Sequence, residues 1–217
     1  MRKHKHKLEQ LWLLIPLFGI LFFVLLYYVA TKYYPGGSQL NNQTKEFSWA
    51  QNYWCNLLNE NAMNGMHNPA RPIAIFAMIV LAFTLIIFWF LFTQQILFGR
   101  RMKIFIRSSA VISMFFCMLL FTSLHDMAIN LATLFGLIPI TGTFIGLKKL
   151  KWIKLFWMGL FIILFILLNN FLYYKQGMLY YLPIVQKITF LYFLTWICLI
   201  DINLFKNFIS KEKFISK

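Results

Sequence analysis

Long apolar runs alternate with short polar or basic connectors over the whole chain. Runs of about 18 or more apolar residues are typical of helices that cross a membrane. Six such runs cover Leu11–Tyr34, Ile73–Phe98, Ile104–Leu124, Met127–Leu147, Leu155–Tyr174 and Pro183–Phe205. The pattern predicts an all-α fold, a polytopic membrane protein with six transmembrane helices that form a single domain over residues 1–217.

The segment from Pro35 to Pro72 is a long polar stretch between the first two apolar runs. Pro72 suits the first turn of the second helix, because the N–H that proline lacks would have no partner there. The sequence therefore predicts one long loop between helices 1 and 2, and this loop is the first place to look for a working surface.

Charged residues are scarce and unevenly placed, at 12% of the chain with a net charge of +15. Sixteen of the 21 Lys and Arg residues lie in the two terminal segments and in the connectors near residues 100–107 and 148–154. The other connectors and their flanks hold only Lys32, Lys45, Arg71, Lys175 and Lys187. Basic connectors face the cytoplasm, which predicts cytoplasmic termini and an outer loop at 35–72. The charge is explained by topology, so no nucleic-acid partner is expected.

Two stripes of small residues predict a close pair of helices. Ala128, Ala132 and Gly136 recur at intervals of four in the fourth run, and Ser109, Ser113 and Cys117 do so in the third. Residues spaced in this way share one helix face, and small residues let membrane helices approach closely. The third and fourth helices, joined by a short turn, are therefore expected to form a tight antiparallel pair.

Polar side chains in the apolar runs gather towards the predicted outer side, where they are candidates for function. With the polar residues of the loop they predict a ligand site made of Asn52, Trp54, His67, Asn68, Arg71, Asn130, Asn170 and Lys187. Cationic and amide groups of this kind bind phosphate, so the favoured ligand is a lipid headgroup or another membrane-associated ligand. We expect Arg71, His125 and Asp126 to approach one another there, with at least one of Asn52, Asn68 or Lys187.

Other interpretations of these residues stay open. Cys55, His125 and Asp126, or His67 in place of His125, would supply the nucleophile, base and acid of an outer-leaflet lipid hydrolase or acyl transferase. A zinc site would need about three ligands, for which His67, His125 and Asp126 are the candidates, but no metal and no cofactor are expected. His125 and Asp126 also suit a simple turn cap, and Lys187 suits an interfacial lysine or a partner of Asp126.

Several short motifs carry a resemblance to known proteins. They are Phe47-Ser48-Trp49, Asn52-Tyr53-Trp54-Cys55, Asn68-Pro69-Ala70-Arg71-Pro72 and Leu124-His125-Asp126. On these motifs the chain resembles a bacterial six-span membrane family of unknown function and, more distantly, the FRAG/DRAM/SFK-type proteins of eukaryotic membranes. The resemblance implies six helices with an outer-side motif and a role in membrane-lipid organisation or anchor-lipid processing. It supplies no catalytic residue.

The remaining expectations concern location and partners. Lys is preferred over Arg and Ile, Phe and Asn are abundant, which indicates an AT-rich genome and a bacterial source. The expected location is the cell membrane, as a multi-pass protein of the bacterial inner membrane. Membrane lipids are the expected partners, and a second copy of the chain or another membrane protein is left open.

Overall fold

The computed structural model describes residues 11–122, 124–175 and 177–215 of the 217-residue chain. These residues form six long helices and one short 3-10 helix, with no β-strand among them. The elements are α2 (Ile15–Tyr33), η1 (Trp54–Leu58), α3 (Arg71–Gln95), α4 (Arg100–Cys117), α5 (His125–Lys149), α6 (Ile153–Tyr174) and α7 (Leu182–Ile215). The predicted all-α fold is confirmed.

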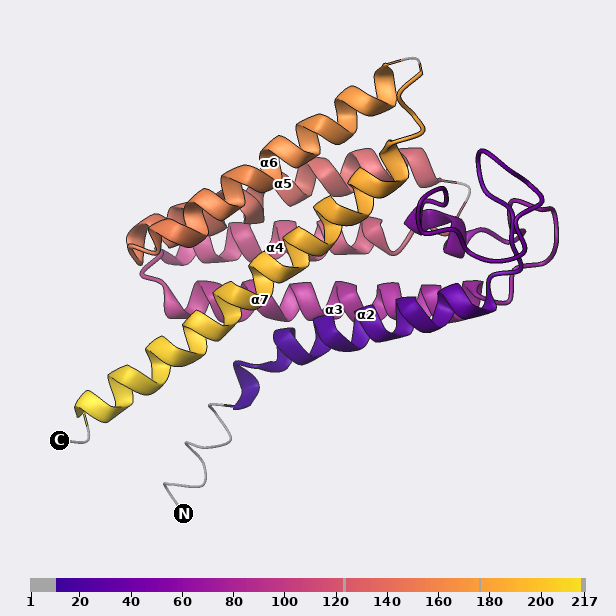
Figure 1. The fold of residues 1–217 in the computed structure, drawn as a ribbon. Helices are drawn as coiled ribbons and strands as arrows, with labels where there is room; N and C mark the ends of the chain where they lie inside the picture. Colours follow the sequence, from indigo (N-terminus) through magenta and orange to yellow (C-terminus); the bar gives the residue numbers. More distant parts are fainter. Residues whose placement is uncertain (1–10, 123, 176, 216–217) are drawn as a thin grey trace.

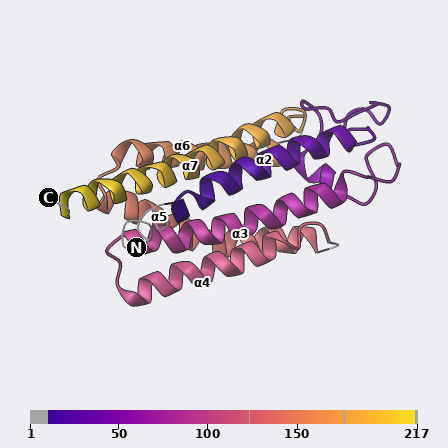
Figure 2. The ribbon, with the colours of Figure 1, turned by 90° about the horizontal axis from the view of Figure 1, so that it is seen from below.

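Helices that follow one another in the chain pack side by side, and α7 closes the bundle by packing against both α6 and α2 (Figures 1 and 2). Helix α3 lies furthest inside, because it also contacts α5 and α7. The connectors 96–99 and 150–152 lie at one end, here called the basic end (Figure 1). The segment 34–70, the turns at 118–122 and the turns at 177–181 lie at the opposite end, here called the loop end.

Within the described residues, five helices are long and apolar enough to cross a membrane. They are α2, α3, α5, α6 and residues 182–209 of α7, and their number and apolar character are those of an integral membrane protein. Each lies within one of the predicted runs or extends it by a few residues, apart from the last turns of α7. The boundaries of these five predicted helices are therefore close to the observed ones.

Helix α4 differs from the predicted third span, Ile104–Leu124. It begins at Arg100, so that its 18 residues include four basic ones, and it ends at Cys117. Beyond that residue the amide N–H groups bond the carbonyl three positions earlier, as Leu119 does with Phe116 at 3.0 Å and Thr122 with Leu119 at 3.0 Å. The chain thus reaches residue 122 in tightened turns rather than as α-helix, and the helical part alone carries too many basic residues to qualify as a span.

The close pair of α4 and α5 is confirmed. Ser109, Ser113, Ala128 and Ala132 are buried, and the Ser113 hydroxyl donates a 2.7 Å hydrogen bond to the Ala132 carbonyl. A Cβ atom added at Gly142 would lie 2.5 Å from the end of the Ile106 side chain of α4, so a larger residue there would require Ile106 to shift. Small residues and one buried hydroxyl therefore hold the pair together, as expected for membrane helices.

Polar contacts between distant helices are few at the basic end and each is specific. The indole N–H of Trp196 in α7 donates to the Leu155 carbonyl in α6 at 2.7 Å. Asp201 of α7 is 0% exposed, and its Oδ2 accepts the Leu17 N–H at 3.3 Å. Leu17 lies in the first turn of α2, which has no side-chain cap of its own. Asp201 therefore supplies, from another helix, the acceptor that an N-cap residue normally provides.

Candidate functional site

The loop between α2 and α3 is a folded unit that covers the loop end of the bundle (Figure 1). Its entry turn uses glycines in the left-handed region, with φ of +120° at Gly36 and +80° at Gly37. The Gly37 N–H donates to the Thr44 carbonyl at 2.8 Å. A Cβ atom at Gly37 would lie 2.2 Å from the amide nitrogen of Asn64, so the two ends of the loop meet there. We call residues 34–70 the cap.

Asn52 is buried at the centre of the cap. Its Oδ1 accepts the Ser48 N–H at 2.8 Å, and its Nδ2 donates to the Gly37 carbonyl at 2.8 Å. One side chain thus ties the first half of the cap to its entry turn. Since both of its polar atoms are bonded to backbone groups, the Asn52 amide is already satisfied within the cap.

Asn68 plays the same part in the second half. It is buried, and its Nδ2 lies within hydrogen-bond distance of three carbonyls, those of Asn56, Leu57 and Asn59, the last at 2.9 Å. Its Oδ1 accepts the Ala70 N–H at 3.1 Å. Asn68 therefore closes the carbonyl end of η1, which would otherwise leave buried acceptors without donors.

Lys187 of α7 fastens the cap to the bundle. Its side chain is 6% exposed, and its Nζ donates to the carbonyl of Asn52 and, at 2.9 Å, to that of Pro183. The ammonium also lies 5.7 Å from the centre of the Phe47 ring, a favourable cation–π arrangement. Asp126, the partner that the sequence suggested, is fully exposed, so Lys187 binds the cap and not that carboxylate.

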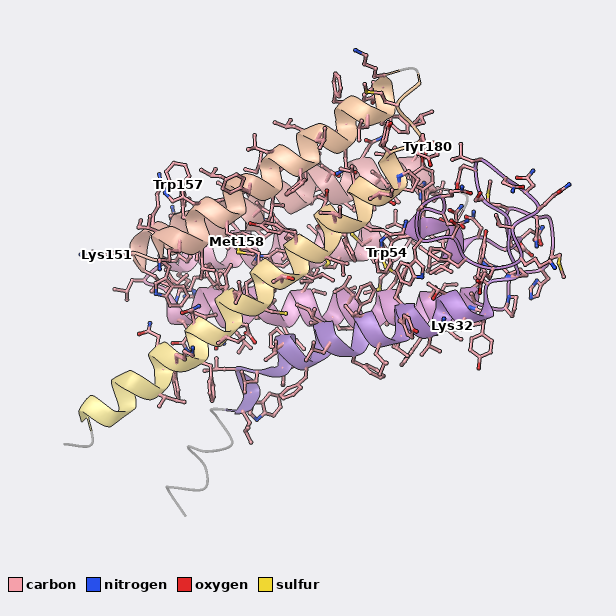
Figure 3. The ribbon with its side chains drawn as sticks, in the orientation of Figure 1. Lys32, Trp54, Lys151, Trp157, Met158 and Tyr180 are labelled. Atoms are coloured by element: carbon pink, nitrogen blue, oxygen red, sulfur yellow. The ribbon has the colours of Figure 1, made fainter. Side chains whose placement is uncertain are left out.

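Trp54, the first residue of η1, lies on the inner side of the cap, facing the helices (Figure 3). Its ring centre is 4.8 Å from that of Tyr27 and 5.7 Å from that of Phe190, so it joins α2 and α7 through aromatic contacts. Its backbone N–H lies 3.4 Å from the Gln186 side-chain oxygen. Its indole Nε1 is buried without a hydrogen-bond partner among the described residues.

Arg71, the first residue of α3, lies at the seam between the cap and the turns at 118–122. Its Nε donates to the Leu58 carbonyl at 3.2 Å, and its Nη2 donates to the Phe121 carbonyl at 3.4 Å. A guanidinium has five N–H donors, so three remain after these two bonds. Among the described residues no carboxylate forms an ion pair with Arg71. We call this position the Arg71 seam.

The other predicted site residues are more open to solvent or lipid. The His125 Nδ1 lies 3.2 Å from Asp126 Oδ1, with side chains 37% and 100% exposed. His67 and Asn130 are exposed, and the Asn170 amide donates to the Ile166 carbonyl of its own helix at 2.9 Å. The turn that precedes His125 is the one that Arg71 contacts through Phe121, but among the described residues no hydrogen bond or ion pair joins Arg71 to either His125 or Asp126.

Cys55 lies in η1, within the cap, and has no hydrogen bond to either of the two described histidines. No hydrogen bond connects its sulfur to His67 or His125 within the described ranges. Burial raises the pKa of the Cys55 thiol, an effect that its own backbone hydrogen bond and the Lys187 charge only partly oppose. A nucleophilic cysteine needs the opposite shift. In the described part of the chain no three His, Cys, Asp or Glu side chains are grouped as metal ligands require.

Some of the hydrogen-bonding groups at the loop end could not be predicted from the sequence. The carbonyls of Phe121 and Asn52 receive the two cationic side chains, and every residue has a carbonyl, so composition gives no signal for them. Asn169 donates to the Thr189 hydroxyl at 2.6 Å and links α6 to α7. In this region the sequence predicted only the neighbouring Asn170, as a ligand-site residue.

The chain matches no protein-family model, no curated protein and no solved structure.

Proposed function

We propose that this is a six-span protein of the bacterial inner membrane with both termini in the cytoplasm. In addition to the five helices already described, the third span in chain order would be α4 together with the turns up to residue 122. These turns extend its apolar surface towards the loop end. Arg107, the most deeply placed of its four basic residues, donates to the Thr93 hydroxyl at 2.8 Å and lies 4.9 Å from the Phe90 ring centre. Thr93 and Phe90 of α3 therefore give the Arg107 charge favourable contacts near the membrane surface.

We further propose that the loop end faces outwards and binds the anionic headgroup of a lipid at the Arg71 seam. Arg71 carries this proposal, because it is a half-buried guanidinium with free donors and no carboxylate partner among the described residues. Phosphate oxygens match such a fork of N–H groups. His125 and Asn130 begin the neighbouring helix and would extend the polar surface around the headgroup.

The same geometry narrows the predicted ligand set. Asn52, Asn68 and Lys187 give their hydrogen bonds to protein carbonyls, so in this proposal they shape the cap and Arg71 makes the contact with phosphate. Lipid binding thus depends on a preformed cap, because the cap and the turns at 118–122 together position the guanidinium. Preorganised groups of this kind bind without an ordering cost.

Native mass spectrometry of the detergent-purified protein with dioleoyl phosphatidylglycerol tests the proposal. Arg71→Gln should weaken the affinity for one bound lipid by about 10- to 100-fold, the equivalent of one or two charge-assisted hydrogen bonds. Phosphatidylglycerol binding that is unchanged in Arg71→Gln would refute the assignment. Lys175→Gln, which removes an exposed lysine at the same end, is the matched control and should bind as wild type does.

A further inference from the structure

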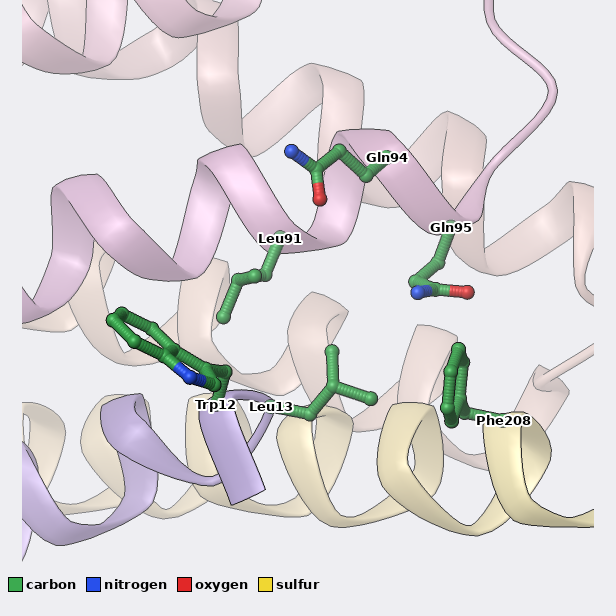
Figure 4. Close-up of a pocket in the computed structure, with 6 residues that line it drawn as sticks. All are labelled: Trp12, Leu13, Leu91, Gln94, Gln95 and Phe208. Atoms are coloured by element: carbon green, nitrogen blue, oxygen red, sulfur yellow. The ribbon is translucent and has the colours of Figure 1, made fainter. Parts of the chain in front are cut away.

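A cavity of about 380 Å³ lies at the basic end, far from the cap. Three separate segments form it, which are the residues before α2, the last turns of α3 and the distal part of α7 (Figure 4). Its lining consists of Trp12, Leu13, Leu91, Gln94, Gln95 and Phe208. The volume lies within the range of about 300–1,000 Å³ that small-molecule pockets occupy.

The lining combines apolar and hydrogen-bonding groups in one place. Leu13, Leu91 and Phe208 supply apolar surface, and the amides of Gln94 and Gln95 supply donors and acceptors. Neither amide bonds another described side chain or carbonyl, and no acidic residue is among the lining residues. An amphipathic ligand with a neutral or anionic polar part fits such a surface.

The position of the cavity identifies the class of ligand. Gln94 and Gln95 end α3, and Trp12 precedes α2 with 62% of its surface exposed. Both helices are apolar enough to cross a membrane, so the cavity lies where their apolar surface ends, at the depth of lipid headgroups. Tryptophan is enriched at that depth. The 100–107 and 148–154 segments, which are rich in basic residues, begin or end at this end of the bundle, which favours an anionic ligand.

We propose that this cavity binds the headgroup and glycerol region of an anionic glycerophospholipid of the leaflet at the basic end. The two glutamine amides bond hydroxyl and ester groups of the lipid, and the leucines and Phe208 contact the start of its acyl chains. This site does not depend on the Arg71 seam, which lies at the other end of the bundle.

The test counts bound dioleoyl phosphatidylglycerol by native mass spectrometry on the full chain. Gln94→Leu/Gln95→Leu nearly keeps the side-chain size and removes both amides. It should therefore weaken the affinity for one bound lipid by about ten-fold or more. Leu13→Trp fills the cavity from a different segment and should abolish the same lipid. Gln43→Leu, an exposed amide of the cap, is the matched control.

The outcomes separate this site from the one at the loop end. If both sites exist, Arg71→Gln and the double glutamine variant each lose one lipid, and their combination loses two. Loss only in Arg71→Gln overturns the cavity assignment alone, and loss only in the glutamine variant overturns the seam alone. Wild-type binding by Gln94→Leu/Gln95→Leu or by Leu13→Trp, with an unchanged melting temperature, contradicts the cavity proposal, as does an equal loss in Gln43→Leu.

Discussion

Replacing Lys187 with methionine should release the cap from α7. Methionine keeps most of the side-chain length and its apolar stem but has no donor. The substitution therefore removes the hydrogen bonds to the carbonyls of Asn52 and Pro183 and the contact with the Phe47 ring. The Asn52 carbonyl, on a residue that is 0% exposed, would be left without this donor.

The size of the effect follows from these contacts. Hydrogen bonds to a charged donor contribute about 1.5–3 kcal/mol each, and an orphaned buried acceptor costs about 1–3 kcal/mol. Part of this is offset, because a buried ammonium has a desolvation penalty that methionine lacks. A net loss of about 2–4 kcal/mol in the free energy of cap docking is expected, which raises the open fraction by about 30-fold to several hundred-fold.

Alkylation of Cys55 measures this opening, because Cys55 is a partly buried residue of η1, within the cap and close enough to Lys187 to be influenced by its charge. Its rate, followed by mass spectrometry of the Cys55 peptide, should rise in Lys187→Met as the open fraction rises, as for other local openings. The Lys187 charge lowers the pKa of the Cys55 thiol, so its removal cannot activate the sulfur, and faster alkylation reports exposure. Lys175→Met removes an exposed lysine at the same end and should leave the rate unchanged. If Cys55 of Lys187→Met is alkylated at the wild-type rate, Lys187 does not hold the cap against α7.

Three further predictions concern single residues. Because burial raises the pKa of Cys55 above the ordinary 9.0, its thiolate is scarcer at neutral pH, and alkylation of the native protein should keep rising with pH beyond the point at which an exposed cysteine levels off. Asn68→Ala removes the donor to three carbonyls and the acceptor of one N–H, so it should destabilise the cap by about 2–3 kcal/mol and speed the same alkylation, whereas Asn42→Ala should not. Asp201→Leu removes the acceptor of the Leu17 N–H and should lower the melting temperature, for a loss of about 0.5–2 kcal/mol as at other N-caps. Asp201→Asn keeps an acceptor, and a drop as large as that of the leucine variant would contradict the capping role.

The sequence predicted the helices well because its apolar runs are local features. The stripes of Ser109, Ser113, Ala128 and Ala132 likewise marked the α4–α5 contact, since both helices carry small residues at the same interval. The end of α4 at Cys117 was missed because the apolar residues after it are indistinguishable in hydropathy from those before it. Only the change to bonds between residues three apart marks that boundary.

The candidate site was predicted in position but less well in detail. A buried asparagine looks the same in sequence whether it binds a ligand or satisfies a carbonyl, and Asn52 and Asn68 do the latter. The decisive contacts join residues far apart in the chain, with 135 positions between Lys187 and Asn52 and 184 between Asp201 and Leu17. No local pattern specifies such pairs, because they depend on how the helices meet.

Accessibility of a single cysteine at position 124 tests the proposed six-span topology most directly. Leu124 is 48% exposed and lies in the turn between α4 and α5. If α4 crosses the membrane, Leu124→Cys in a background without the native cysteines should react with an impermeant maleimide added to intact cells, as Gln43→Cys in the cap should. Lys151→Cys at the basic end should react only after permeabilisation. Protection of Leu124→Cys in intact cells while Gln43→Cys is labelled would show that α4 does not cross, and would contradict the six-span account.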